Sequence, residues 1–246
     1  MSGHSHAKTV AATKNANDAK KGKIYSKYGR LITIAVKEGG GSGDPTTNAK
    51  LKTIIEQAKE MNMPKENIER AIKKGTGELV GDNLDEVSFE AFGPGGIALI
   101  INAITDNKNR TLGEIKVILN MNNSKLAGEG AVRWMFENKG VIVLDLKLQN
   151  TDLQDKENLE LLAIEAGAED IKQEEEVVVI YTGPTNLDIV KKTLEEKQIK
   201  IDSASIVLMA KEEVLVSEKE KEQCQKLFNA LDDNDAVQDV FSNLKN

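Results

Sequence analysis

The residues whose types and spacing best suit a chemical task are lysines and arginines near the N-terminus. One set recurs at intervals of three, four and three residues, which places it along one face of a helix: Lys20, Lys23, Lys27 and Arg30, with Lys21 beside them. A second set would lie on the outer face of a later helix: Lys65, Arg70, Lys73 and Lys74. Cations arranged in this way suit phosphate binding, because each one placed near a nucleic-acid backbone releases condensed counterions.

The second set also has a purely structural interpretation, and so does a third candidate contact that lies further along the chain. Pairs four residues apart, Glu66 with Arg70 and Glu69 with Lys73, would stabilise a solvated helix face without any ligand. The third candidate is a polar segment whose amides and charges suit phosphates and 2′-hydroxyls: Asn107, Lys108, Asn109 and Arg110. The alternative for this segment is helix capping and turn geometry.

The charge of the chain is divided unevenly along its length. Residues 1–77 carry 15 Lys and Arg against 7 Asp and Glu, whereas residues 78–246 carry 18 against 33. The formal net charge of −7 therefore hides a basic N-terminal segment attached to an acidic remainder. This division predicts that the N-terminal segment contacts a polyanion, and that the remainder is repelled by nucleic acid unless it points away.

Few residues are available for catalysis or metal binding. The chain has two histidines, His4 and His6, and one cysteine, Cys224. This set cannot form a structural zinc site, and nucleophilic catalysis would have to recruit a histidine from the extreme N-terminus. No pair of carboxylates stands out from the general acidity. We therefore expect a binding protein that is not an enzyme, with no cofactor and no small-molecule substrate.

The bulk composition is that of an ordinary globular chain. It has 246 residues, of which 39% are apolar and 30% charged, and no apolar stretch approaches the ~20 residues of a membrane span. Residues 1–23 lack the apolar core of a signal peptide. The single Cys224 excludes an internal disulfide and fits a reducing compartment. These features predict a cytoplasmic protein with no membrane partner.

Hydrophobic periodicity predicts three N-terminal helices behind a mobile basic arm, residues 1–14. The first helix covers about 15–37, the second contains Leu51 and Ala58, and the third begins near Pro64 and stops at Gly75. The glycine-rich run 39–45 between the first two helices is predicted to be a flexible connector. It is not a phosphate cradle, because no Gly-Lys-Ser/Thr follows it.

Beyond Gly81 the pattern changes to short strands alternating with helices. The predicted strands cover 87–92, 97–104, 132–136, 140–146, 171–174, 177–181, 199–201, 206–216 with an interruption at 211–213, and 237–241. We predict an α+β protein in which a helical N-terminal domain precedes two α+β sandwich domains, the third inserted in the second. The expected domains are 1–78, then 79–129 together with 207–246, and the inserted 130–206.

Seven segments, taken together and in this order, resemble the YebC/PmpR family. They are Gly3–Ser5, Asp18–Lys23, Gly39–Gly41, Asn62–Gly75, Gly93–Gly96, Thr105–Thr111 and Ala166–Asp170. The resemblance implies the same three-domain fold and a non-enzymatic regulator of gene expression. The chain departs from the family where relatives carry Lys-Trp after Gly-His-Ser, because His6 and Ala7 follow here. The N-terminal arm thus lacks the aromatic group with which relatives could stack on bases.

Two functions are compatible with this resemblance, because members of the family include DNA-binding transcriptional regulators and a mitochondrial translational activator. In the first, the basic face binds rRNA or tRNA on the ribosome. In the second, the chain is a DNA-binding transcriptional regulator. We expect the first, because Asn67, Arg70 and lysines offer little with which to read base edges. No helix-turn-helix turn joins the second and third helices.

Overall fold

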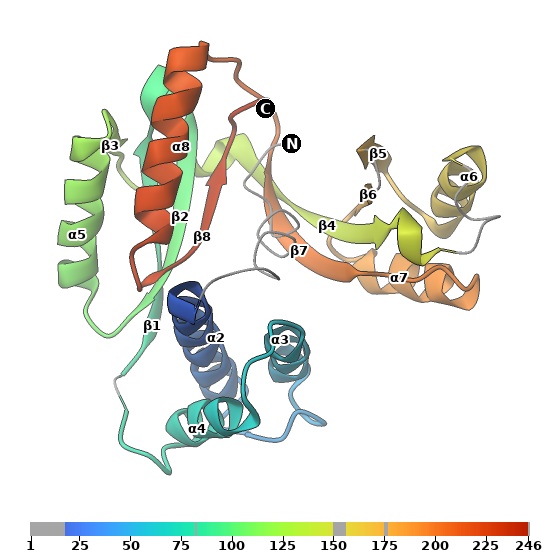
Figure 1. Ribbon diagram of the computed structural model, residues 1–246, viewed down its shortest axis with the longest axis horizontal. Coiled ribbons are helices and arrows are strands. Elements are labelled where there is room, and N and C mark those ends of the chain that lie inside the picture. Colours follow the sequence, from blue (N-terminus) through green and yellow to red (C-terminus); the bar gives the residue numbers. More distant parts are fainter. Residues whose placement is uncertain (1–17, 82, 150–155, 175–176, 246) are drawn as a thin grey trace. The chain divides into compact units, whose positions relative to one another are not determined.

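The structure is a computed structural model that describes residues 18–81, 83–149, 156–174 and 177–245 (Figure 1). The chain divides into two compact units. The first comprises residues 1–135 and 212–246, and the second comprises residues 136–211. The basic arm expected over residues 1–14, including His4 and His6, lies outside the described residues.

The first unit begins with three helices: α2 (Asp18–Glu38), α3 (Ala49–Glu60) and α4 (Lys65–Thr76). Their apolar faces form one core, to which α2 gives Ile32 and Val36 and α3 gives Leu51. Helices α2 and α4 approach closely at Gly75, where an added Cβ would lie 2.6 Å from the Cβ of Val36. Gly75 is therefore a packing position inside α4, and the prediction that it ends the helix was wrong. The helix ends at Gly77, whose φ of 83° is left-handed.

The glycine-rich run 39–45 is a loop, as predicted, but it is held by hydrogen bonds. Gly39 donates its backbone N–H to Ala35 O, and Gly41 donates to Val36 O. Next to the loop, the buried side chain of Asn48 donates to Ala35 O at 2.8 Å and accepts from Leu51 N at 3.0 Å. Asn48 thus caps α3 and ties its start to the end of α2.

The rest of the first unit is an antiparallel sheet covered by two helices. The strands are β1 (Asp85–Phe92), β2 (Ala98–Thr105), β3 (Lys125–Leu126) and β8 (Val237–Ser242), in the order β3-β1-β2-β8. A 3₁₀ turn, η1 (Pro94–Gly96), joins β1 to β2. Helices α5 (Lys108–Met121) and α8 (Glu218–Asp232) lie beside this sheet (Figure 1). Their apolar side chains share one core with Leu99 and Ile101 of β2.

The second unit is a second antiparallel sheet, in the order β5-β6-β4-β7. Its strands are β4 (Phe136–Asp145), β5 (Asp170–Glu174), β6 (Val177–Thr182) and β7 (Ser203–Ala210). Helices α6 (Lys156–Ala166) and α7 (Leu187–Glu196) share a core with β4 and β6. Two 3₁₀ segments, η2 (Arg133–Met135) and η3 (Leu146–Leu148), flank β4.

Three predictions within this second unit were wrong. The expected strands 132–136 and 140–146 are not separated by a turn, because Asn138 and Lys139 belong to β4 and pair with Leu208 and Val207 of β7. Residues 199–201 form no strand; Ile199 is apolar because it fills the core below the sheet. The strand expected over 206–216 is β7, which ends at Ala210, just before the expected interruption at 211–213, and it joins the second sheet instead of the domain 79–129 with 207–246. Strand pairing with distant segments here overrides local turn and strand preference.

The predicted fold class is confirmed: a helical N-terminal region is followed by two α+β sheets, each with its own core. The division into domains 1–78, 79–129 with 207–246, and 130–206 stays a prediction. The compact units divide instead at 135/136 and at 211/212, because β7 must stay with its partner β4.

Candidate nucleic-acid interface

The cations of α4 lie on the outside of the helical region. Ile68 and Ala71 point into the core, and the 3.6-residue period leaves an exposed face that carries Lys65, Arg70, Lys73 and Lys74. Lys65 Nζ lies 3.6 Å from Glu69 Oε1, and Arg70 donates to Asn67 Oδ1 at 3.0 Å. The pairs of the structural alternative, Glu66 with Arg70 and Glu69 with Lys73, do not appear among the ion pairs described for this helix. The last turn of α4 therefore presents two cations, Lys73 and Lys74, to solvent, and Arg70 is exposed one turn earlier.

The cations of α2 are arranged differently from the predicted solvent-facing stripe. Lys23 Nζ lies 2.7 Å from Asp233 Oδ1, and Lys27 Nζ lies 2.6 Å from Asp232 Oδ1. The Lys27 side chain is only 17% exposed and that of Lys23 is 31% exposed. The expectation that these side chains face open solvent was wrong, because the C-terminal end of α8 and the turn after it lie against them.

Arg30, Lys20 and Lys21 complete the predicted stripe. Arg30 donates through one guanidinium nitrogen to the backbone carbonyls of Asp235 and, at 3.5 Å, of Ile104. Lys21 is exposed in the first turns of α2. Lys20 belongs to α2, but its side chain is outside the described part of the structure. The structure thus separates the two basic sets: α4 carries its cations outward, and α2 packs three of its own against the acidic turn.

The segment from Asn107 to Arg110 has mainly local roles. Asn107 is the N-cap of α5, and its side chain accepts from Arg110 N at 3.1 Å. Lys108 Nζ lies 3.7 Å from Asp85, and the Arg110 guanidinium pairs with Asp106 and, at 3.8 Å, with Glu114. Asn109 is exposed on the first turn of α5. These contacts are those of the capping alternative.

The pKa of Asp106 is influenced by cations from both α5 and α2. Its pKa lies below the ordinary value, chiefly because Arg110 hydrogen-bonds to the carboxylate. The positive charge of Arg30 on α2 adds a smaller effect in the same direction. Arg30 therefore lies near negative groups from two places in the first unit, the β2–α5 connection and the turn after α8.

Sequence reasoning missed the residues that meet α2, namely Asp232, Asp233 and Asp235. Asp232 ends α8 and Asp233 is its C-cap. Negative side chains at a helix C-terminus face the negative end of the helix dipole and are unfavourable there. Three aspartates at this position were the available signal that a cation from elsewhere in the chain lies opposite.

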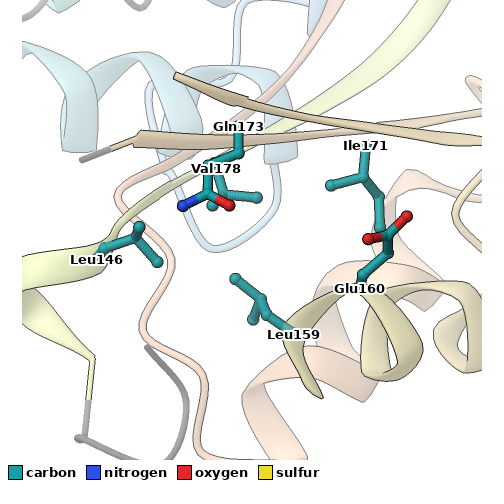
Figure 2. A pocket seen from close by; sticks show the side chains of 6 residues that line it. All are labelled: Leu146, Leu159, Glu160, Ile171, Gln173 and Val178. Carbon is teal, nitrogen blue, oxygen red and sulfur yellow. The ribbon is translucent and has the colours of Figure 1, made fainter. Parts of the chain in front are cut away.

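The cavity described in the second unit is small. In the second unit, a cavity of about 110 Å³ is lined by Leu146, Leu159, Glu160, Ile171, Gln173 and Val178 (Figure 2). Small-molecule sites typically occupy about 300–1,000 Å³, so this cavity is smaller than a usual ligand pocket. Among the described residues, no three His, Cys, Asp or Glu side chains gather as metal ligands. Nor does the described part contain a helix long and apolar enough to cross a membrane.

Comparison with known proteins places this arrangement in a family. Residues 5–78 match the family model described as the TACO1/YebC protein N-terminal domain, and residues 84–244 match that of the TACO1/YebC second and third domain. The chain belongs to the TACO1/YebC family. The resemblance stated from the sequence motifs is thereby confirmed.

Individual TACO1/YebC relatives match along their whole length. A probable transcriptional regulatory protein of Caldanaerobacter subterraneus is 46% identical over 245 residues, covering 100% of this chain and 98% of the relative. One of the same description from Thermotoga maritima is 45% identical, with 100% and 94% covered. The crystal structure of a conserved hypothetical protein from Aquifex aeolicus is similar with a TM-score of 0.81 at 42% identity, covering 93% of this chain and 91% of that one.

Proposed function

We propose that this chain is a nucleic-acid-binding regulator of gene expression that acts by binding and not by catalysis. The observation that carries the proposal is the outward face of α4, where Lys65, Arg70, Lys73 and Lys74 are all exposed on one side of a single helix. The core side chains of α4 hold this face outward, so phosphates can approach it without any change in the helix. Lys73 and Lys74 in the last turn also complement the helix dipole, a role compatible with binding.

DNA is the first candidate ligand. The relatives that match this chain along their full length are named probable transcriptional regulatory proteins. These names favour transcriptional regulation over the ribosomal role that the sequence alone led us to expect. In this role α4 would hold the phosphates of a duplex, and recognition of a particular site would depend on further contacts or on DNA shape.

RNA on the ribosome is the second candidate, and one observation favours it. The exposed face of α4 offers three lysines and one guanidinium, and Arg70 is hydrogen-bonded to Asn67. Lysines bind phosphates as point charges and discriminate poorly between base edges. A surface of this kind suits phosphates that a folded RNA has already placed.

Competition at a fixed salt concentration separates the two candidates. Binding of the whole chain to genomic DNA fragments and to ribosomes is measured at ~150 mM salt with excess competitor duplex, because nonspecific phosphate contacts weaken steeply with salt. Under the DNA proposal, a footprint at a defined promoter survives. Co-sedimentation with ribosomes and no surviving footprint would instead establish the RNA candidate, and failure of both would refute nucleic-acid binding.

A further inference from the structure

The turn after α8 places three acidic residues where a helix tolerates them poorly. Asp232 is the last residue of α8, Asp233 is its C-cap, and Asp235 follows two residues later. Their charges add to the negative end of the helix dipole instead of compensating it. Capping by Lys or Arg would be the favourable choice for this helix alone. The cations that compensate this end come from α2, more than two hundred residues earlier in the chain.

The contact between α2 and this turn is an ordered one-to-one pairing. Lys23 meets Asp233 at 2.7 Å and Lys27 meets Asp232 at 2.6 Å. Arg30 donates to the backbone carbonyl of Asp235. The two carboxylates thus hold lysines that lie one helical turn apart on one face of α2.

The carboxylate side of the pairing is open to water and salt. The carboxylate side chains of Asp232 and Asp233 are 68% and 78% exposed, so water solvates them whether or not the lysines are present. The lysine side chains are less exposed, at 31% for Lys23 and 17% for Lys27, but salt still screens an ion pair whose carboxylate faces water. Nucleic acid offers denser negative charge than two carboxylates, and its binding releases counterions as well.

We propose that the acidic turn Asp232–Asp235 is an intramolecular competitor of nucleic acid. It occupies Lys23 and Lys27 in the unbound protein and leaves them when phosphates bind, so that α2 adds its basic stripe to that of α4. This inference rests on the proposed function, because it concerns regulation of the same basic surface. Nonspecific polyanions at low occupancy then meet α4 alone, and only a ligand that reaches both helices displaces the turn.

Neutralising the turn tests the proposal directly. Asp232→Asn with Asp233→Asn removes the competing charges and nearly preserves side-chain shape. Glu212→Gln with Glu213→Gln is the matched control, since both residues are exposed and their change gives the same increase in net charge. Binding of each variant to a mixed-sequence duplex DNA and to a structured RNA is measured at low and at physiological salt. The thermal midpoint of each is recorded.

The two variants are expected to differ. The aspartate variant should bind about tenfold more tightly than wild type at low salt, because nucleic acid no longer has to break two ion pairs. This gain should shrink as the salt concentration rises. The control should gain much less, because it changes only the overall charge. If the aspartate variant binds no better than the control, or more weakly, the turn is a structural contact and the proposal is overturned.

Cross-linking of the wild-type chain keeps the proposal testable even if the aspartate variant is unstable. A carbodiimide joins an amine to a carboxylate only where the two are in contact, so Lys23–Asp233 and Lys27–Asp232 peptides should form and be found by mass spectrometry. Saturating nucleic acid without terminal phosphates should reduce their yield several-fold, and an unchanged yield refutes displacement. Failure of the proposed function looks different, because wild-type protein would then bind neither probe.

Discussion

Replacing Glu90 by glutamine should loosen the segment that leads from β3 to β4. Glu90 lies on β1, and its carboxylate accepts three backbone N–H groups of this segment. Oε1 accepts from Gly130 at 2.6 Å, and Oε2 accepts from Val132 at 2.6 Å and from Arg133 at 3.0 Å. The segment contains almost no regular secondary structure of its own, so this carboxylate is its main tie to the first sheet.

The size of the effect follows from the two oxygens. An amide can present its single oxygen to one side only, so its NH₂ group must face a backbone N–H on the other. Hydrogen bonds to a charged acceptor contribute about 1.5–3 kcal/mol and those to a neutral one about 0.5–1.5 kcal/mol. One of the three hydrogen bonds is lost, and the other two are made to a neutral acceptor instead of a charged one. The site is partly in contact with solvent, which reduces the effect. We expect Glu90→Gln to cost about 2 kcal/mol, mostly as local opening.

Amide hydrogen exchange measures this opening at the affected residues. In the Glu90→Gln variant, protection of the Gly130 and Val132 amides should fall by about 2 kcal/mol, while amides at the centre of β2 change little. Acid should have the same effect on wild type. Burial raises the pKa of Glu90, but the three backbone donors outweigh it and leave the pKa lowered. Its contribution is therefore complete above the unfolded pKa, about 4.3, and lost as pH falls through the folded value. Unchanged protection at Gly130 in the variant would refute this account of the segment.

Three further predictions concern the helical region. Gly75→Ala should destabilise the chain by about 2 kcal/mol, because the added Cβ would clash with Val36. Gly29→Ala should instead stabilise it by about 0.5–1 kcal/mol, because an added Cβ there would have no atom within 4 Å. Urea unfolding compares the free energies of unfolding of the two variants. Asn48→Ala should cost about 2 kcal/mol in the same assay, since it removes a helix cap and a buried hydrogen bond. Burial, with nearby carboxylates, raises the pKa of Tyr28 from 10.0 to about 12. The stability that its neutral form contributes is complete below pH 10 and lost as pH rises towards 12, and Tyr28→Phe should abolish that loss.

Elements with a strong local signal could be predicted from the sequence. The periodic apolar residues of α2, α3 and α4 gave three helices, and the β1–β2 and β5–β6 hairpins followed from alternation and turn residues. Strand β4 was divided wrongly at Asn138 because those polar residues resemble a turn until their pairing with β7 is known. The end of α4 was misplaced because Gly75 is required by the nearby α2 backbone, which local sequence does not reveal.

In the candidate site, too, features with a local sequence signal could be predicted and features set by distant contacts could not. Exposure of Arg70 and Lys73 follows from the period of α4, so the sequence predicted it correctly. The pairing of Lys27 with Asp232 joins residues 205 positions apart, and no local pattern in α2 indicates it. Only the acidic end of α8, unfavourable in isolation, pointed to a cation from elsewhere.

The salt dependence of nucleic-acid binding by an α4 variant tests the central claim most directly. Arg70→Glu with Lys73→Glu reverses two exposed cations of the proposed face, and Lys219→Glu with Lys226→Glu, two exposed residues of α8, makes the same change in net charge elsewhere. Each phosphate contact to duplex DNA contributes about 0.9 to the slope of log K against log salt. We predict that the α4 variant binds more weakly and loses about 1.8 from that slope, while the α8 variant keeps the wild-type slope. Equal slopes for wild type and the α4 variant, or an equal loss in both variants, would contradict the assignment of phosphate binding to α4.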